Sequence, residues 1–174
     1  MQLLTRTYVW LGACLLSLLA ACGNADDAAS SAEEAVRRTV AALCEGRFED
    51  IEGLLITDDD LSWLIETMAT GDSRQAKKFR KRHAEIGAAA MVKESRERVR
   101  KSFDALRKEA AEEGVVWADV RFDRLHKLET VTADGVEAAQ CYVRLRIGDK
   151  PGEIKMRTML RTPRGWILVG GMRS

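Results

Sequence analysis

In residues 139–147, Ala139-Gln140-Cys141-Tyr142-Val143-Arg144-Leu145-Arg146-Ile147, apolar side chains occupy every second position. Successive side chains of an extended strand point to opposite faces, so this strand has one apolar and one polar face. Turn signals flank it, with Asp134-Gly135 before it and residues 149–152 after it. The stretch therefore predicts a half-buried strand of an antiparallel sheet.

The same period of two continues on both sides of this strand. Upstream, a strand is predicted by apolar residues that alternate with mostly polar ones, namely Val116, Ala118, Val120 and Phe122. Downstream, the next strand has the inward face Ile154, Met156, Thr158 and Leu160. After the turn Pro163-Arg164-Gly165, a last strand covers Trp166 to Val169. We expect a meander of about four antiparallel strands.

The preceding part of the chain has helical periodicity instead. Ser31 and Glu34 fit a capping box at the start of a first helix, which Gly46 ends. A short helix over residues 48–55 follows, and then a helix capped by Thr57 or Asp58. Residues 72–114 contain no proline and predict one long helix or two, with a break at Gly87. Helices followed by strands indicate an α+β protein.

This order of elements resembles the nuclear transport factor 2-like, cystatin-like α+β fold. The similarity covers residues 31–169 and includes the turn Glu45-Gly46-Arg47-Phe48-Glu49-Asp50 and the final strand Gly165-Trp166-Ile167-Leu168-Val169. It implies N-terminal helices packed on a curved sheet, the cystatin-like cone, within a single domain over residues 31–174. Some members of this class are isomerases or dehydratases, which place Asp, His or Tyr inside the cone.

The first 22 residues have the three parts of an export signal. Arg6 charges the n-region, residues 8–19 form an apolar run, and Ala20 and Ala21 precede Cys22. Leu19-Ala20-Ala21-Cys22 resembles the lipobox of bacterial lipoproteins. The resemblance implies cleavage between Ala21 and Cys22, diacylglycerol on the Cys22 thiol, a signal helix over residues 1–21 and a flexible tether over residues 22–30. The alternative is an ordinary secretory signal with an incidental cysteine.

A lipid on Cys22 implies a place in the bacterial cell envelope, because two or more acyl chains hold a protein on a membrane. Gly23 rather than Asp follows the cysteine. By the same resemblance, this favours the outer membrane, facing the periplasm, in a host with two membranes. The apolar run of the leader is shorter than the roughly 20 residues that a membrane-spanning helix needs.

The charge balance limits the partners. The chain has 28 basic and 27 acidic residues, and the leader removes one basic residue, Arg6. The mature chain is therefore nearly neutral, which argues against nucleic-acid binding. The densest charge is a basic cluster made of Arg74, Lys77, Lys78, Arg80, Lys81 and Arg82. This cluster is either a solvated helix face or a contact surface for anionic lipid or an acidic envelope polymer.

Two cysteines remain for the folded domain. Cys14 leaves with the leader and Cys22 takes the lipid, so only Cys44 and Cys141 can pair. They form a disulfide, which an oxidising envelope permits, or they stay two buried thiols. In the fold that the chain resembles, both cysteines face one core, which makes a bridge geometrically reasonable.

Signatures of catalysis and of metal binding are weak. His83 and His126 lack metal-ligand spacing, and the chain has no Gly-x-Ser-x-Gly motif. In regular strands Asp119 and Asp123 share the polar, outward face, His126 faces inward and Tyr142 faces outward. The alternation of side chains therefore brings no acid and base together. We expect no metal, no cofactor and a non-enzymatic module that binds an envelope protein, an anionic lipid or a polymer. A small-ligand cup is the competing hypothesis, and an isomerase-like or dehydratase-like enzyme is the third.

Overall fold

The structure, a computed structural model, describes residues 27–174. Its helices are α1 (Ala32–Glu45), the 3-10 helix η1 (Phe48–Leu54), α2 (Asp58–Met68), α3 (Arg74–Ile86), α4 (Ala88–Glu112) and the 3-10 helix η2 (Trp117–Asp119). Its strands are β1 (Val120–Ala133), β2 (Val136–Ile147), β3 (Lys150–Thr162), β4 (Gly165–Leu168) and β5 (Met172–Arg173). All α-helices precede the strands, which confirms the α+β class. The expected signal helix, the cleavage site and Cys22 lie outside the described residues.

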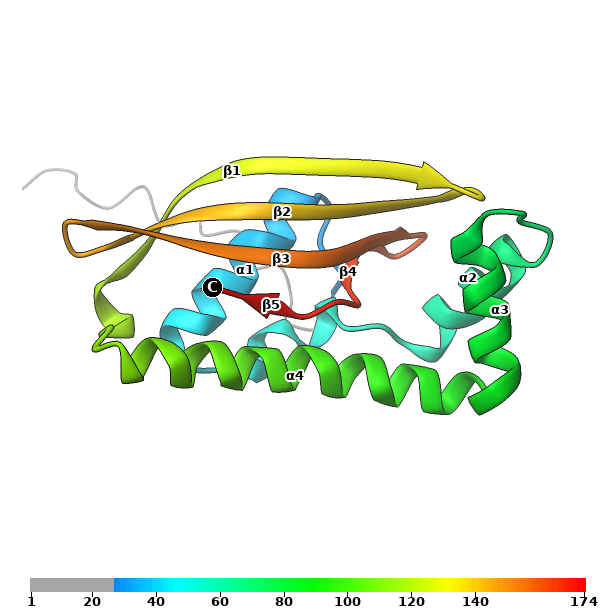
Figure 1. The fold of residues 1–174 in the computed structure, drawn as a ribbon, viewed down its shortest axis with the longest axis horizontal. Helices are drawn as coiled ribbons and strands as arrows, with labels where there is room; N and C mark the ends of the chain where they lie inside the picture. The colour runs from blue at the N-terminus through cyan, green and yellow to red at the C-terminus, as the bar shows by residue number, and fades with distance from the viewer. Residues whose placement is uncertain (1–26) are drawn as a thin grey trace, which may run out of the picture.

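The strands form one antiparallel sheet that stays open. Its order is β1-β2-β3-β4, and β5 pairs with β3 next to Lys155 and Met156. Figure 1 shows β1, β2 and β3 as long, curved strands with α1 packed behind them. Helix α4 runs along the lower edge of this view, opposite β1. The expected meander of four strands is therefore present, with a fifth short strand added at Met172 and Arg173.

The sheet buries apolar side chains on both faces. Met159 of β3 pairs with Leu168 of β4, and both lie in a first core together with α1, η1 and the second half of α4. The next residue, Leu160, pairs with Ile167, and both pack in a second core with α2, α3 and the start of α4. Because neighbouring side chains of a strand point to opposite faces, the two cores lie on opposite sides of the sheet.

Helix α1 follows its sequence signals. The Ser31 side chain accepts a hydrogen bond from the Glu34 backbone N–H, and Gly46 ends the helix with a φ of 75°. The Glu34 carboxylate accepts from the Ser30 backbone N–H at 2.8 Å, so the reciprocal half of the capping box is displaced by one residue. Its apolar residues Val36, Val40 and Leu43 are buried in the first core.

The packed domain begins earlier than the sequence predicts. Ala29 is fully buried and forms an isolated β-bridge with Trp166. The Trp166 N–H donates to the Ala29 carbonyl at 2.7 Å, and Arg38 donates to the Asp27 carbonyl at 2.7 Å. The expected flexible tether over residues 22–30 is therefore corrected, since its last four residues belong to the folded domain.

The start of the sheet also differs from the prediction. Trp117–Asp119 form a 3-10 helix, and Val116 is 57% exposed, so the expected inward face begins only at Val120. Two register shifts interrupt β1, between Phe122 and Arg124 and between Leu125 and Lys127. A bulge adds one residue to one strand and reverses the parity beyond it. His126, which has inward parity in a regular strand, is for this reason exposed.

The long helical stretch divides at Gly87, as predicted. Gly87 has a φ of 77°, a left-handed conformation that disfavours residues with a side chain. Helix α4 then continues for 25 residues and buries Val99, Phe103 and Leu106 in the first core. The Phe103 ring meets the Phe48 ring of η1 edge to face, with centroids 5.4 Å apart.

An ion pair joins the last hairpin to the helical half. Arg164, in the β3–β4 turn, donates to the Asp60 carboxylate at 2.8 Å and to the carbonyls of Gly53 and Leu55. The Asp60 side chain is 2% exposed and also completes the capping box of Thr57 at the start of α2. Burial acts to raise the pKa of Asp60, but hydrogen bonds from Arg164, Thr162 and Thr57 outweigh it and leave this pKa lowered.

We expect Arg164→Ala to lower the free energy of unfolding by about 3 kcal/mol, because it leaves the buried Asp60 carboxylate unpaired. Urea denaturation followed by circular dichroism measures the change. The matched control is Arg161→Ala, since the Arg161 side chain is 65% exposed and pairs with Glu137 at the surface. The control should cost less than about 1 kcal/mol. Equal losses in the two variants would contradict this role of Arg164.

The same pair predicts a pH dependence. Because the folded pKa of Asp60 is lowered, its stabilisation is complete above the ordinary aspartate pKa of about 3.9 and is lost as the pH falls through the folded value. The difference in unfolding free energy between the wild type and Arg164→Ala should therefore be full at neutral pH and shrink below about pH 4. A difference that stays constant down to the acid transition would count against an ionised Asp60.

Candidate functional site

The outward face of α3 carries four cations. Arg74, Lys77, Lys78 and Lys81 have the spacing of one helical stripe, and together with Asp72 they line an open hollow. The side chains of Lys77 and Lys81 are 62% and 78% exposed. Their ion pairs are long, at 3.9 Å from Lys77 to Asp72 and 3.9 Å from Lys81 to Glu85. We call this stripe the cationic face of α3.

The structure gives the other two residues of the predicted basic cluster different roles. Arg80 points to the end of α2, where it donates to the carbonyls of Met68 at 2.7 Å and Gly71 at 2.6 Å. Arg82 donates to both carboxylate oxygens of Glu94 on α4, each at 2.8 Å. Arg80 and Arg82 are thus engaged within the protein, which leaves four residues of the predicted basic cluster on the outward face of α3.

A pocket of about 780 Å³ opens between α2, α3, α4 and β3, on the side of the second core. We call it the α2–α4 pocket. Its apolar lining consists of Ile56, Leu61, Leu64, Phe79, Met91, Leu160 and Val169. Its polar lining includes Lys78, Arg82, Glu94, Ser95, Arg98 and Thr158. Most of these residues are remote in sequence, so only the hairpin of α3 and α4 brings them together, and no local signal predicts the pocket.

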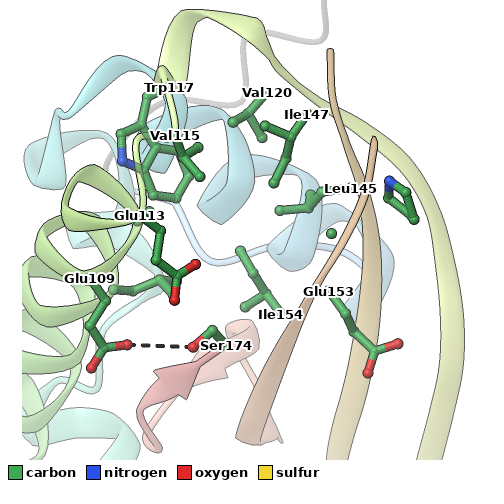
Figure 2. A pocket seen from close by; sticks show the side chains of 14 residues that line it. Glu109, Glu113, Val115, Trp117, Val120, Leu145, Ile147, Glu153, Ile154 and Ser174 are labelled. Atoms are coloured by element: carbon green, nitrogen blue, oxygen red, sulfur yellow. Dashed lines mark hydrogen bonds between the residues drawn. The ribbon is translucent and has the colours of Figure 1, made fainter. Parts of the chain in front are cut away.

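A second, smaller pocket lies at the other end of the molecule. It has a volume of about 230 Å³ and an apolar wall that includes Trp117, Val120 and Leu145. Figure 2 shows Glu109 of α4 and Glu113, just after the end of α4, on one side of it and Glu153 of β3 on the other. Its only charged lining residues are these three glutamates. This acidic pocket is below the roughly 300 Å³ at which small-molecule sites begin.

The two cysteines of the domain are free thiols. The Cys44 thiol approaches the Val120 carbonyl at 3.6 Å, and Val120 pairs with Ile147 on β2. Cys141 lies six residues further along that strand, which is roughly 20 Å at about 3.3 Å per residue. A disulfide needs α-carbons within about 7 Å of each other. Of the two alternatives that the sequence leaves open, the structure therefore has the two separate thiols, because α1 meets the sheet near Ile147 of β2 and not near Cys141.

The residues considered for acid-base catalysis do not converge. Asp119, Asp123 and His126 are exposed, and the Tyr142 hydroxyl accepts a hydrogen bond from Lys155 at 2.8 Å. His83 is half-buried on α3. Over residues 27–174, no three His, Cys, Asp or Glu side chains come together as a metal site. Within the same range, no helix is long and apolar enough to cross a membrane.

The two thiols should differ in reactivity. Burial raises the pKa of Cys141 to about 11, and burial likewise raises that of the less covered Cys44. Because the thiolate is the reactive form, Ellman's reagent at pH 8 should label Cys44 slowly in the native protein and Cys141 only after denaturation.

The measurement is a thiol count on the mature protein without reductant. Cys44→Ser is the control and should remove the native signal alone. A denatured protein that shows no thiol until reductant is added would contradict the two free cysteines.

Comparison with known proteins returns no relative of this chain. No protein-family model, no curated protein and no solved structure matches it.

Proposed function

We propose that this protein is a lipoprotein of the bacterial cell envelope, anchored through Cys22, whose domain is a non-enzymatic binding module at the membrane surface. The observation that carries the proposal is the cationic face of α3. Four cations point outward from one helix, and the ion pairs of two of them, Lys77 and Lys81, are long, at 3.9 Å each. Such a face suits the anionic headgroups of a bilayer.

The packing of the domain begins at Asp27, close in sequence to Cys22, which implies a short distance between the lipid and the domain. Asp27 is held by Arg38, and only five Cα–Cα steps separate it from Cys22. Because each step spans at most about 3.6 Å, Asp27 stays within about 18 Å of the lipidated residue. Ala28 packs against the same second core as Phe79 of α3. A lipid on Cys22 therefore keeps the helical end of the domain near the surface.

The strength of the contact can be bounded. A Lys or Arg beside an anionic leaflet contributes about 1 kcal/mol, and the attraction decays within a Debye length of about 8 Å at physiological salt. Four such cations would orient a domain that is already anchored. Without the lipid they would give only a weak, salt-sensitive association.

The packing of the first core supports binding rather than catalysis. We propose that the domain is a variant of the cystatin-like, nuclear transport factor 2-like fold, with α1 against the inner face of an open, curved sheet. The space inside that curve is filled by side chains such as Val40, Leu43 and Phe103, each at most 3% exposed. Within residues 27–174, only the acidic pocket remains beside these side chains, and its volume of about 230 Å³ is below the roughly 300 Å³ at which small-molecule sites begin.

The anchor is tested by Cys22→Ser in the native host. We expect the variant to keep its leader and to carry no lipid by mass spectrometry, because the modified thiol is gone. Cys44→Ser is the control, since it removes a thiol of the folded domain and should leave processing unchanged. A Cys22→Ser protein that is cleaved and retained on the membrane as the wild type is would refute the lipobox.

The cationic face is tested with the mature chain made without lipid, as residues 23–174, and vesicles of phosphatidylcholine with phosphatidylglycerol. Replacing Arg74, Lys77 and Lys81 with Gln should weaken sedimentation with the vesicles roughly a hundredfold at low salt, at about 1 kcal/mol per charge.

The charge-matched control replaces Lys93, Lys101 and Lys108 of α4, whose side chains are 78%, 81% and 78% exposed. It should bind as the wild type does. Equal losses in the two triple variants would indicate a general charge effect and no surface specific to α3. Retention on an acidic polymer but not on these vesicles would assign the face to a polymer instead.

A further inference from the structure

We propose that the α2–α4 pocket binds a single-chain anionic amphiphile, a molecule with one acyl chain and a carboxylate head. The acyl chain would lie along the apolar lining between α2 and β3, and the head would meet Lys78 and Arg98 at the mouth. The inference goes beyond the proposed function, because it requires neither the lipid anchor nor a contact with an anionic bilayer.

Size separates this pocket from the acidic pocket. Small-molecule sites in proteins occupy about 300 to 1,000 Å³. The α2–α4 pocket has a volume of about 780 Å³, whereas the acidic pocket has about 230 Å³. Of these two apolar pockets, the α2–α4 pocket is the one large enough for a long apolar chain.

The lining is suited to a flexible chain. Leu61 and Leu64 of α2 form a floor that is at most 2% exposed. Phe79 of α3, Met91 of α4 and Leu160 of β3 line the pocket but are only partly buried, so they keep apolar surface in contact with water. An acyl chain would remove that surface from water, which is favourable in proportion to the apolar area. Methionine adapts its shape to such a chain.

Charge at the mouth selects an anion. The lining has three cations and one carboxylate, Glu94, and Arg82 already donates to both oxygens of that carboxylate. Lys78 forms no ion pair with a described residue, and the one hydrogen bond of Arg98 reaches the Val169 carbonyl at 3.5 Å. A guanidinium has five N–H donors. Among the three lining cations, Lys78 and Arg98 are therefore the two whose charge is not paired with a carboxylate of the described residues.

Hydrogen bonds around the Val169 carbonyl hold the chain in place beside Arg98. Ser95 of α4 is 8% exposed and donates to the Val169 carbonyl at 3.3 Å, the same oxygen that Arg98 reaches. The Val169 and Gly170 N–H groups donate in turn to the Thr158 carbonyl. These bonds hold the end of β4 against α4, so Arg98 stands at a defined place on the rim.

The acidic pocket supplies a contrast within the same molecule. It is also lined by apolar residues, but its three charges are all carboxylates, from Glu109, Glu113 and Glu153. It would repel a carboxylate, since like charges disfavour each other. An anionic amphiphile that binds through the features above should therefore occupy one pocket and avoid the other.

The test uses the mature lipidated protein in phosphatidylcholine nanodiscs. The probe is a palmitate analogue with a photoreactive diazirine in its chain, and mass spectrometry locates the adducts. We expect adducts on Phe79, Met91 or Leu160. The alcohol analogue of the same chain should give about tenfold less labelling, the factor expected for a lost charge-assisted hydrogen bond.

Two variants separate head and chain recognition. Arg98→Gln should lower labelling by the carboxylate about tenfold and leave labelling by the alcohol unchanged. The control is Lys101→Gln, an equal charge change at an 81% exposed side chain nearby on α4, and it should label as the wild type does. Leu160→Trp fills the pocket and should abolish adducts, with circular dichroism to check folding. If the Leu160→Trp variant unfolds, the difference in carboxylate labelling between Arg98→Gln and Lys101→Gln decides whether the proposal holds.

Several results would overturn the proposal. They are equal labelling by carboxylate and alcohol, stronger labelling by the amine analogue, adducts in the acidic pocket, and undiminished adducts in Arg98→Gln. Displacement of the probe by two-chain phosphatidylglycerol as readily as by palmitate would replace the single-chain ligand with a bilayer lipid. The variant of Arg74, Lys77 and Lys81 should keep its pocket adducts, so failure of the membrane contact and failure of this inference are distinguishable.

Discussion

The ion pair of Asp60 with Arg164 holds the helical half of the chain at the point where it passes from the first core to the second. The main chain passes from the first core to the second between Leu55 and Ile56. Arg164 donates to the Leu55 carbonyl and to the Asp60 carboxylate just beyond that crossing. One side chain of the β3–β4 turn therefore fixes where the helical half changes faces. Since the Asp60 side chain is 2% exposed, removing its partner leaves a buried charge with no equivalent compensation.

Helix α4 makes use of this arrangement. It contributes Val92 to the second core and Val99, Phe103 and Leu106 to the first. A straight helix of 25 residues reaches about 37 Å, at 1.5 Å per residue, so it can serve both cores. Its first half also lines the α2–α4 pocket through Met91, Glu94, Ser95 and Arg98, on the side of the second core.

Helix α3 borders both proposed binding sites, the cationic face and the α2–α4 pocket. Lys78 lines the open hollow of the cationic face and also the mouth of the α2–α4 pocket. Phe79, the next residue, faces the second core. A domain held close to a bilayer through Cys22 would place this mouth near a surface where amphiphiles are concentrated. Membrane contact and ligand binding are thus separate proposals that share one helix, and each has residues of its own, Arg74 for the first and Arg98 for the second.

The α+β class and most of the local structure follow from the sequence alone. The alternation over Ala139 to Ile147, the cap at Ser31 and the break at Gly87 act over a few residues, and each predicts its element correctly. The lipobox is equally local, and it stays a prediction that concerns residues outside the structure. The tertiary structure decided what depends on register and on long-range packing. The first bulge in β1 turned His126 outward. The contact of α1 near the Ile147 end of β2 separated Cys44 from Cys141, and the hydrogen bonds of Arg80 and Arg82 within the protein took these two residues out of the exposed basic cluster. The α2–α4 pocket belongs to the same group, because residues from Ile56 to Gly170 line it and no periodicity links them.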